Sequence, residues 1–296
     1  MQLSLGIKPE TIDHLYSLIN NEGFNKDYII WVFLYFHTYM PIGQLAVICG
    51  VSYRTMISHI NGTISILYEK VKYLINNIEP SVGTINYNGV TFSMAAIDSM
   101  CVLVNKPQDD VVQKTLYSKK HGDHLWKFEF IVGLDGKLLY ISPAFEGSRH
   151  DKAIQDITRS AQVFPYPIFG DKGYKGATNI ASPVKKKSDH LTPDEKLYNN
   201  FISPQRVIID NFFNYIKRFK ILSTHFRSKD QKEKLEKIIF IIAYAINFQL
   251  NFNSNNNNNI IYFNPISTHN RNKNNNNNNN NNDHDNNNRN DDENIL

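Results

Sequence analysis

The chain has 296 residues, of which 41% are hydrophobic and 20% are charged, and its formal net charge is +4. This length suffices for one large domain or two modest ones with a sizeable core. The two cysteines, Cys49 and Cys101, exclude a disulfide framework and any zinc site built on paired CxxC motifs. The longest apolar run, 238–248, is shorter than the roughly 20 residues that cross a bilayer. The first residues lack a secretory signature, so we expect a soluble intracellular protein without a membrane partner.

The charge differs between the body of the chain and its C-terminal end. Asn makes up more than half of residues 253–296, where acidic side chains outnumber basic ones. Residues 1–252 carry 29 Lys or Arg against 23 Asp or Glu, a net charge of +6, which is compatible with a nucleic-acid partner without requiring one. The tail has too few apolar residues for a core, and we expect it to be disordered. Its polyasparagine composition favours a eukaryotic protein, hence the nucleus; otherwise we expect the cytoplasm.

Residues 1–80 show helical periodicity, which predicts an all-α N-terminal domain. Within it, a short helix, a turn at Gly50 and a second helix capped by Ser52 predict a helix-turn-helix over 42–64. A plain helical hairpin in a bundle is the alternative. On the second helix, side chains suited to a DNA groove or to phosphates are expected to point outward: Tyr53, Arg54, Thr55, Ser58 and His59.

Strand patterns replace the helical ones from about residue 85. The predicted elements follow in the order strand, strand, strand, helix, strand and helix: 90–104, 126–134, 137–145, 151–161, 166–169 and onward from Pro204. The second and third strands flank an Asp135-Gly136 pair, which predicts a hairpin. This order predicts an α/β domain over 85–252 with a mixed sheet.

Asp98 interrupts the apolar strand that begins near Phe92. An ionised carboxylate among apolar neighbours costs several kcal/mol unless a partner or a metal neutralises it. The functional interpretation is therefore a metal ligand that projects from a central strand. A solvent-facing Asp at a strand end is the alternative.

Asp171 follows the short apolar strand 167–169 and precedes a glycine turn. Ligands of α/β sheets gather at such strand ends. A plain Asp-x-Gly turn is the alternative interpretation.

Asp210 lies on a predicted helix that begins with Ser203 as N-cap and Pro204 at the first position. At about 100° per residue, Arg206 and Lys217 fall on the same border of the apolar arc as Asp210. As surface residues, Arg206 and Asp210 would form an i,i+4 ion pair. As part of a site, the two cations would hold phosphates beside a metal-binding carboxylate.

Five strings in chain order resemble the DDE transposases, in particular the group of bacterial insertion-sequence transposases and Harbinger-type nucleases. The strings are Ala96-Ile97-Asp98, Tyr117-Ser118-Lys119-Lys120, Gly147-Ser148-Arg149-His150-Asp151, Gly170-Asp171-Lys172-Gly173-Tyr174, and Arg206-x3-Asp210-x6-Lys217. The resemblance implies a ribonuclease H-like mixed sheet flanked by helices. It also implies a metal-dependent DNA endonuclease or transposase that acts on double-stranded transposon ends as a homodimer.

The resemblance also implies a division of roles among the residues. Asp98, Asp171 and Asp210 would be the catalytic carboxylates that hold two Mg²⁺ ions, with Mn²⁺ able to substitute. Arg206, Lys217 and Lys172 would bind phosphate. Asp210 stands where the family places Glu, and the residues after Asp98 also depart from the pattern. A degenerate or domesticated DNA-binding protein is therefore the second hypothesis, and a helical module joined to an unrelated α/β domain is the third.

Two further residues have an accessory interpretation. Ser148-x-x-Asp151 has the spacing of a capping box at the helix that begins near His150. A direct role of Asp151 or His150 near the metals is the alternative. We expect His150, like His121 and His124, to face DNA or solvent and not a metal.

Overall fold

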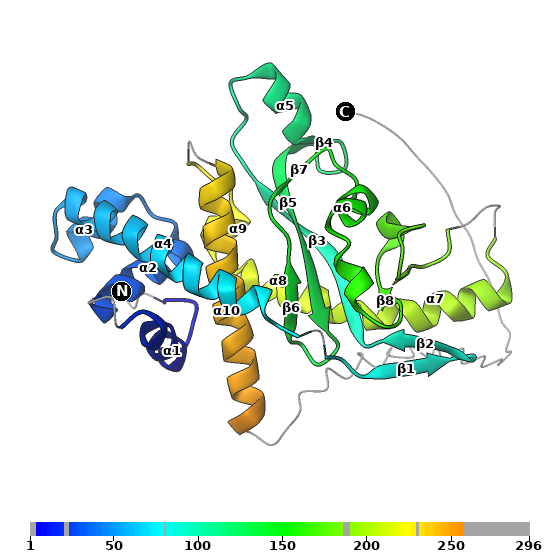
Figure 1. Ribbon diagram of the computed structural model, residues 1–296. Coiled ribbons are helices and arrows are strands. Elements are labelled where there is room, and N and C mark those ends of the chain that lie inside the picture. The colour runs from blue at the N-terminus through cyan, green and yellow to red at the C-terminus, as the bar shows by residue number, and fades with distance from the viewer. Residues whose placement is uncertain (1–3, 21–23, 80, 186–189, 229–230, 257–296) are drawn as a thin grey trace, which may run out of the picture. The chain divides into compact units, whose positions relative to one another are not determined.

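Two regions of different secondary structure make up the described part of the chain in this computed structural model (Figure 1). The structure describes residues 4–20, 24–79, 81–185, 190–228 and 231–256, all within one compact unit. The Asn-rich tail, 253–296, lies almost entirely outside the described residues, and its disorder stays a prediction.

The N-terminal region is helical, as predicted. Its helices within the described residues are α1 (Pro9–Ile19), α2 (Lys26–Thr38), α3 (Ile42–Ile48) and α4 (Tyr53–Asn76). The predicted turn lies between α3 and α4, where Gly50 has a φ of +68°. The Ser52 hydroxyl caps α4 by accepting a hydrogen bond from the Thr55 backbone N–H at 3.1 Å. Both helices begin where the sequence predicts, but α4 continues well past residue 64.

The second region is built on a mixed sheet. Its strands, with the hairpin that precedes them, are β1 (Thr84–Tyr87), β2 (Val90–Ser93), β3 (Ala95–Leu103), β4 (Tyr117–Ser118), β5 (Asp123–Gly133), β6 (Leu138–Ile141), β7 (Phe145–Glu146), β8 (Ile168–Phe169) and β9 (Ile180–Ala181). β3 is central, antiparallel to β5 on one side and parallel to β8 on the other, and β9 adds in parallel to β8. β4, β7 and β6 pair in turn along the far edge of β5. The hairpin predicted at Asp135-Gly136 is confirmed by the antiparallel pairing of β5 with β6.

Helices cover both faces of this sheet. They are α5 (Asp110–Leu116), α6 (Asp151–Thr158), η2 (Ser160–Val163), η3 (Lys172–Tyr174), α7 (Pro193–Gln205), α8 (Val207–Ile216), α9 (Lys220–Ser223) and α10 (Gln231–Asn256). Alternate residues of β3 belong to two different hydrophobic clusters, because successive side chains point to opposite faces. Ile97 packs with η2 and η3, whereas Met100 packs in the cluster that contains α8 and α10.

The predicted start of the Asp210 helix is wrong. Ser203 and Pro204 lie in the last turn of α7, and α8 begins after Arg206, whose side chain makes no capping hydrogen bond. The helix is interrupted at Arg206, two residues after Pro204, because proline has no backbone N–H to donate and its ring crowds the preceding turn. α7 itself was not predicted. A capping box at Thr192 and Glu195, with Pro193 between them, marks its start in the sequence.

α10 corrects the expectation about apolar runs. Among the described residues, one helical stretch, Lys232–Phe252, is long and apolar enough by length and composition to cross a membrane. Half of that stretch is buried in the fold, where Ile238, Ile242 and Ile246 join the same hydrophobic cluster as α4. Such burial is typical of a helix that forms part of a protein core.

Candidate active site

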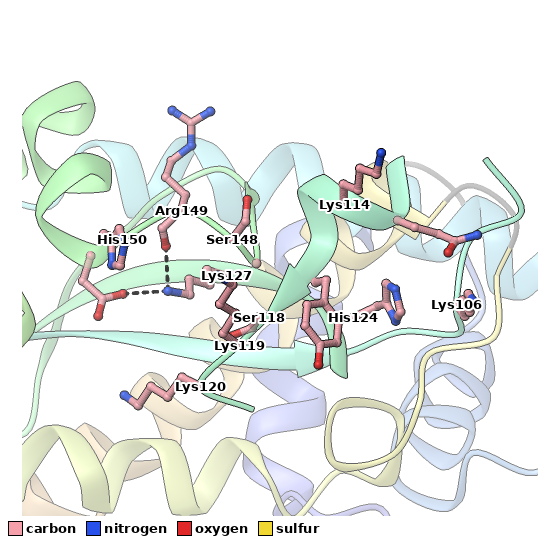
Figure 2. Close-up of a pocket in the computed structure, with 14 residues that line it drawn as sticks. Lys106, Lys114, Ser118, Lys119, Lys120, His124, Lys127, Ser148, Arg149 and His150 are labelled. Atoms are coloured by element: carbon pink, nitrogen blue, oxygen red, sulfur yellow. Dashed lines mark hydrogen bonds and ion pairs between the residues drawn. The ribbon is translucent and has the colours of Figure 1, made fainter. Parts of the chain in front are cut away.

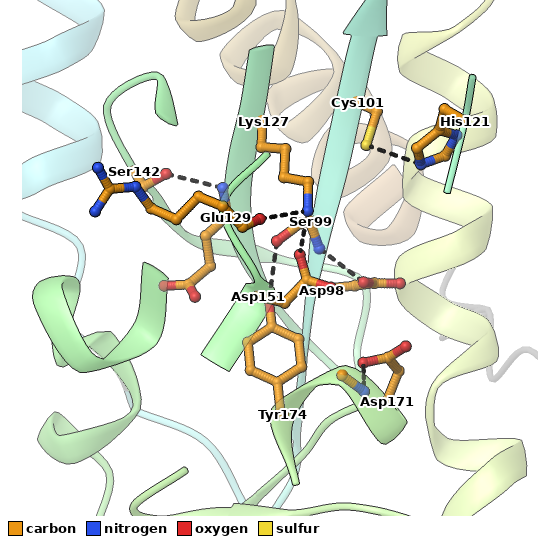
Figure 3. A network of polar contacts seen from close by, with 12 residues as sticks. Asp98, Ser99, Cys101, His121, Lys127, Glu129, Ser142, Asp151, Asp171 and Tyr174 are labelled. Carbon is orange, nitrogen blue, oxygen red and sulfur yellow. Dashed lines mark hydrogen bonds and ion pairs between the residues drawn. The ribbon is translucent and has the colours of Figure 1, made fainter. Parts of the chain in front are cut away.

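Neighbouring strands bring Asp98 and Asp171 to the same level of the sheet. Ala96 of β3 pairs in parallel register with Phe169 of β8, and each aspartate lies two residues further along its own chain segment. The Asp171 charge raises the pKa of Asp98, which is the electrostatic sign of two carboxylates that lie near each other. Figure 3 shows both side chains in one network of polar groups.

Asp98 is a carboxyl group in a predominantly apolar setting. Burial raises the pKa of Asp98 from 3.8 to about 6, the Ser99 backbone N–H opposes that shift, and Asp171 adds to it. The guanidinium of Arg206, 3.9 Å from the Asp98 carboxylate, also favours the ionised form. The nearby positive charge therefore offsets the burial of Asp98 only in part, and its role as a metal ligand stays a prediction.

Asp171 and Asp151 lie on either side of Gly173. The Asp171 carboxylate accepts a hydrogen bond from the Gly173 N–H at 2.6 Å and so caps η3. A Cβ added at Gly173 would lie 2.8 Å from one carboxylate oxygen of Asp151 and 2.8 Å from one of Asp171. The two carboxylates therefore border the same small space, which only a glycine leaves open.

The capping-box interpretation of Ser148 and Asp151 is wrong. The N-cap of α6 is His150, which is exposed and makes no side-chain capping bond. Asp151 instead pairs with Lys127 of β5 at 3.2 Å, and Lys127 also donates to the Arg149 carbonyl at 2.7 Å. Lys127 is only 8% exposed, so the pair fixes Asp151 beside Asp171 and Asp98.

Asp210 is not part of this cluster in the structure. It is exposed on α8, one turn beyond Arg206, and the i,i+4 pair with Arg206 is not formed because Arg206 faces Asp98. Among the described residues, no three Asp, Glu, His or Cys side chains lie close enough to hold one metal ion. Asp98 and Asp171 supply oxygen ligands and negative charge that Arg206 compensates only in part, which suits a divalent cation, but the predicted third ligand stays a prediction.

The predicted phosphate-binding residues occupy different places. Lys172 and Lys217 are exposed. Burial lowers the pKa of His121, and the Lys217 charge adds a smaller contribution in the same direction. On α4, Tyr53, Arg54 and Ser58 are exposed as expected, and Thr55 is half-buried. His59 is also half-buried, and its ring stacks on Tyr28 with centroids 3.9 Å apart.

Glu129 is a buried acid behind the site that sequence reasoning missed. It lies opposite Ser99 in the β3–β5 pairing and accepts hydrogen bonds from Ser160 at 2.7 Å and Thr158 at 2.8 Å. Burial raises the pKa of Glu129 to about 7 against these hydrogen bonds, and its second oxygen has no partner among the described residues. The signal was present: like Asp98, Glu129 interrupts an apolar strand.

Comparison with known proteins identifies the family of the chain. Residues 97–247, more than half of the chain, match the family model of the DDE superfamily endonucleases, and the chain belongs to that family. The chain is also 26% identical over 143 residues to the probable transposase for insertion sequence element IS702 of Microchaete diplosiphon, covering 47% of this chain and 51% of that protein. The chain thus spans about half the length of this curated relative. No solved structure matches the chain.

Proposed function

We propose that this protein is a divalent-metal-dependent nuclease that cleaves DNA phosphodiester bonds and transfers strands in the manner of a transposase. One observation carries the proposal: Asp98 on β3 and Asp171, two residues after β8, lie at the same level of the sheet, and Arg206 lies beside Asp98. Membership of the DDE superfamily endonucleases supports nuclease or transposase activity in general.

We infer a ribonuclease H-like sheet from the strand order and directions. Three strands in antiparallel succession, β3, β5 and β6, are followed by β8 and β9, which run parallel to β3 on its other side. This arrangement places the first acid on the central strand and the second after the next parallel strand. It supports the fold that the family resemblance implies.

Each of these residues would have a separate role in hydrolysis. Asp98 and Asp171 would hold the cations, and we propose Asp210 as the third ligand. Mg²⁺ or Mn²⁺, when bound, would lower the pKa of the attacking water and stabilise the negative charge on the phosphate oxygens. The water oxygen bonds to phosphorus while the bond to the 3′ oxygen breaks, and the products are a 3′-hydroxyl and a 5′-phosphate. Arg206 is placed to neutralise a phosphate oxygen next to Asp98.

Nicking of supercoiled plasmid by the full chain tests this proposal. We expect nicking with Mg²⁺ or Mn²⁺, its loss in EDTA, and its loss in Asp98→Asn and in Asp171→Asn. Asp156→Asn is the matched control, because Asp156 is an exposed carboxylate on α6 that pairs with Lys152 away from the acids. Nicking that survives in both site variants would refute the assignment.

A DNA-binding protein without turnover is the second candidate, and the exposed position of Asp210 favours it. Asp is one methylene shorter than the Glu of the family pattern and reaches less far from α8. Asp210→Glu separates the two candidates. Cleavage that appears only in this variant would identify a decayed site, whereas activity of the unmodified chain that is lost in Asp210→Asn supports the enzyme.

We further propose that α4 contacts double-stranded DNA at transposon ends through Tyr53, Arg54 and Ser58. These side chains are exposed near the start of a helix whose other face is buried at Met56 and Ile60. We also propose that the chain pairs two DNA ends as a homodimer and, if it is eukaryotic, that it is located in the nucleus. Sedimentation of the full chain with and without DNA tests the dimer.

A further inference from the structure

Figure 2 shows the residues that line a basic cavity of about 750 Å³. One of the lining residues, Asp151, belongs to the acidic cluster, which consists of Asp98, Asp151 and Asp171. The walls of the cavity come from α5, β4, the turn after β4, β5 and the loop between β7 and α6. Six basic side chains line it: Lys106, Lys114, Lys119, Lys120, Lys127 and Arg149. Asp151 is the only acidic residue among the described residues that line it.

Most of this positive charge is not neutralised by carboxylates. Lys127 pairs with Asp151, and Arg149 pairs with Glu146 at 3.0 Å. The other four lysines form no ion pair with a carboxylate within the described residues. Clustered cations of one sign attract a polyanion strongly, so the cavity is built for a ligand with several negative charges.

Asp151 joins the basic cavity to the acidic cluster. One of its oxygens accepts from Lys127 at 3.2 Å inside the cavity, and the other borders Gly173 beside Asp171. A linear polyanion bound by divalent cations at Asp98 and Asp171 would therefore lie next to the cavity and could continue into it. A single small anion would use only part of the charge arranged there.

The rim suits a sugar-phosphate chain. Ser148 provides an exposed hydroxyl group, and Tyr117 exposes 42% of its surface. His150 lines the cavity as N-cap of α6 without capping it, so the first N–H groups of that helix add positive potential. Hydroxyl, lysine and backbone N–H groups are the usual partners of DNA phosphates.

We propose that the basic cavity binds the backbone of the DNA strand that leads away from the phosphate that divalent cations at Asp98 and Asp171 would hold. The proposal rests on the proposed function, since it extends the path of the same DNA. It assigns a role to the α5–β4 segment and to Arg149, which the acidic cluster does not use.

Lysine footprinting of the full chain tests the proposal without any substitution. The chain is acetylated with and without a random-sequence DNA duplex, in Ca²⁺ so that no cleavage occurs, and the modified lysines are identified by mass spectrometry. We expect DNA to slow acetylation of Lys106, Lys114, Lys119 and Lys120, and to leave Lys196 on α7 unaffected. Acetylation of the four cavity lysines at the same rate with and without DNA would overturn the proposal. Protection by polyglutamate but not by DNA would overturn it as well.

The salt dependence of DNA affinity provides a second, quantitative test. In Lys114→Ala/Lys119→Ala, the slope of log Kd against log salt should become less steep by about 0.9 for each phosphate that the variant no longer neutralises. Lys26→Ala/Lys196→Ala removes the same charge outside the basic cavity and should keep the slope of the unmodified chain. Equal slopes in the two double variants would contradict the proposal.

Failure of the cavity and failure of the proposed function give different results. If plasmid nicking depends on Asp98 but the footprint is absent, the nuclease proposal stands and the cavity proposal is wrong. If the footprint and the slope change appear in a chain that never nicks DNA, the cavity proposal stands and the catalytic one fails.

Discussion

At the scale of single residues, Asp98 works against the stability of the fold. Its pKa rises to about 6, chiefly because the carboxyl is buried. Since the folded state binds this proton more tightly than the unfolded state, the free energy of unfolding falls as the pH rises from about 3.8 to about 6. At neutral pH the carboxylate is retained at a cost in stability, as is common for a group kept for its chemistry.

Asp98→Asn should therefore stabilise the metal-free protein at neutral pH. We expect a gain of about 1–3 kcal/mol at pH 7 in EDTA, because the amide has no charge to desolvate. The gain should shrink toward about pH 4, where the native carboxyl is protonated. Chemical denaturation at both values measures it, and a variant that is less stable at pH 7 would contradict the electrostatic explanation.

Gly173 is the second residue with a distinct expected phenotype. In Gly173→Ala the new methyl group must push aside the oxygens of Asp151 or Asp171, which lie 2.8 Å from its position. Since both are ends of side chains, stability should change by less than about 1 kcal/mol, while metal-dependent nicking falls at least about tenfold. Gly62→Ala on α4, where nothing lies within 4 Å, is the control and should keep full nicking. Normal nicking by Gly173→Ala would show that the carboxylates need not border this space.

At the scale of elements, the sequence predicts those that local signals define. Gly50 and Ser52 fix the turn between α3 and α4, and the Asp135-Gly136 pair fixes the β5–β6 hairpin. The predicted start of α8 is wrong because Pro204 can begin a helix or interrupt one, and the capping signal at Thr192 is what places Pro204 inside an earlier helix.

The candidate site was only partly predictable for a different reason. Asp98 and Asp171 stand out because each occurs at an apolar strand, which is a local signal. Two other features depend on how distant segments pack. Arg206 faces Asp98 and not Asp210, and Asp151 pairs with Lys127. Helical spacing places side chains on one face of their own helix and does not say what lies opposite.

The α3–α4 segment allows stability and DNA binding to be separated. Ser52→Ala removes the cap of α4 and should lower the free energy of unfolding by about 1 kcal/mol. Arg54→Ala changes an exposed residue and should leave stability within about 0.5 kcal/mol while weakening binding to duplex DNA. Thermal unfolding and fluorescence anisotropy measure the two effects. Unchanged DNA affinity in Arg54→Ala would exclude this residue from the interface.

At the scale of the whole molecule, the described regions share one hydrophobic cluster. α10 packs against α4 as well as against α8 and β6, and the cluster runs from Leu15 of α1 through Ile242 to Phe130 of β5. The predicted division at residues 80–85 therefore falls within a continuous core, although the change of secondary structure occurs there.

A shared core predicts a single unfolding transition. We expect helical circular dichroism and tryptophan fluorescence, from Trp31 in α2 and Trp126 in β5, to change together on denaturation. Ile242→Ala in α10 should lower the midpoint for both probes by the same amount, with a loss of about 2–5 kcal/mol. Two separate transitions would indicate that the helical region and the sheet fold independently.

Binding of Mn²⁺ to the full chain, followed by the loss of the free-ion signal in electron paramagnetic resonance, tests the central claim most directly. We predict saturable binding that disappears in Asp98→Asn and in Asp171→Asn and is kept in Asp156→Asn, because the first two carboxylates lie at the same level of the sheet and near enough for the Asp171 charge to raise the pKa of Asp98. Mn²⁺ binding of equal strength in all four proteins would contradict the claim.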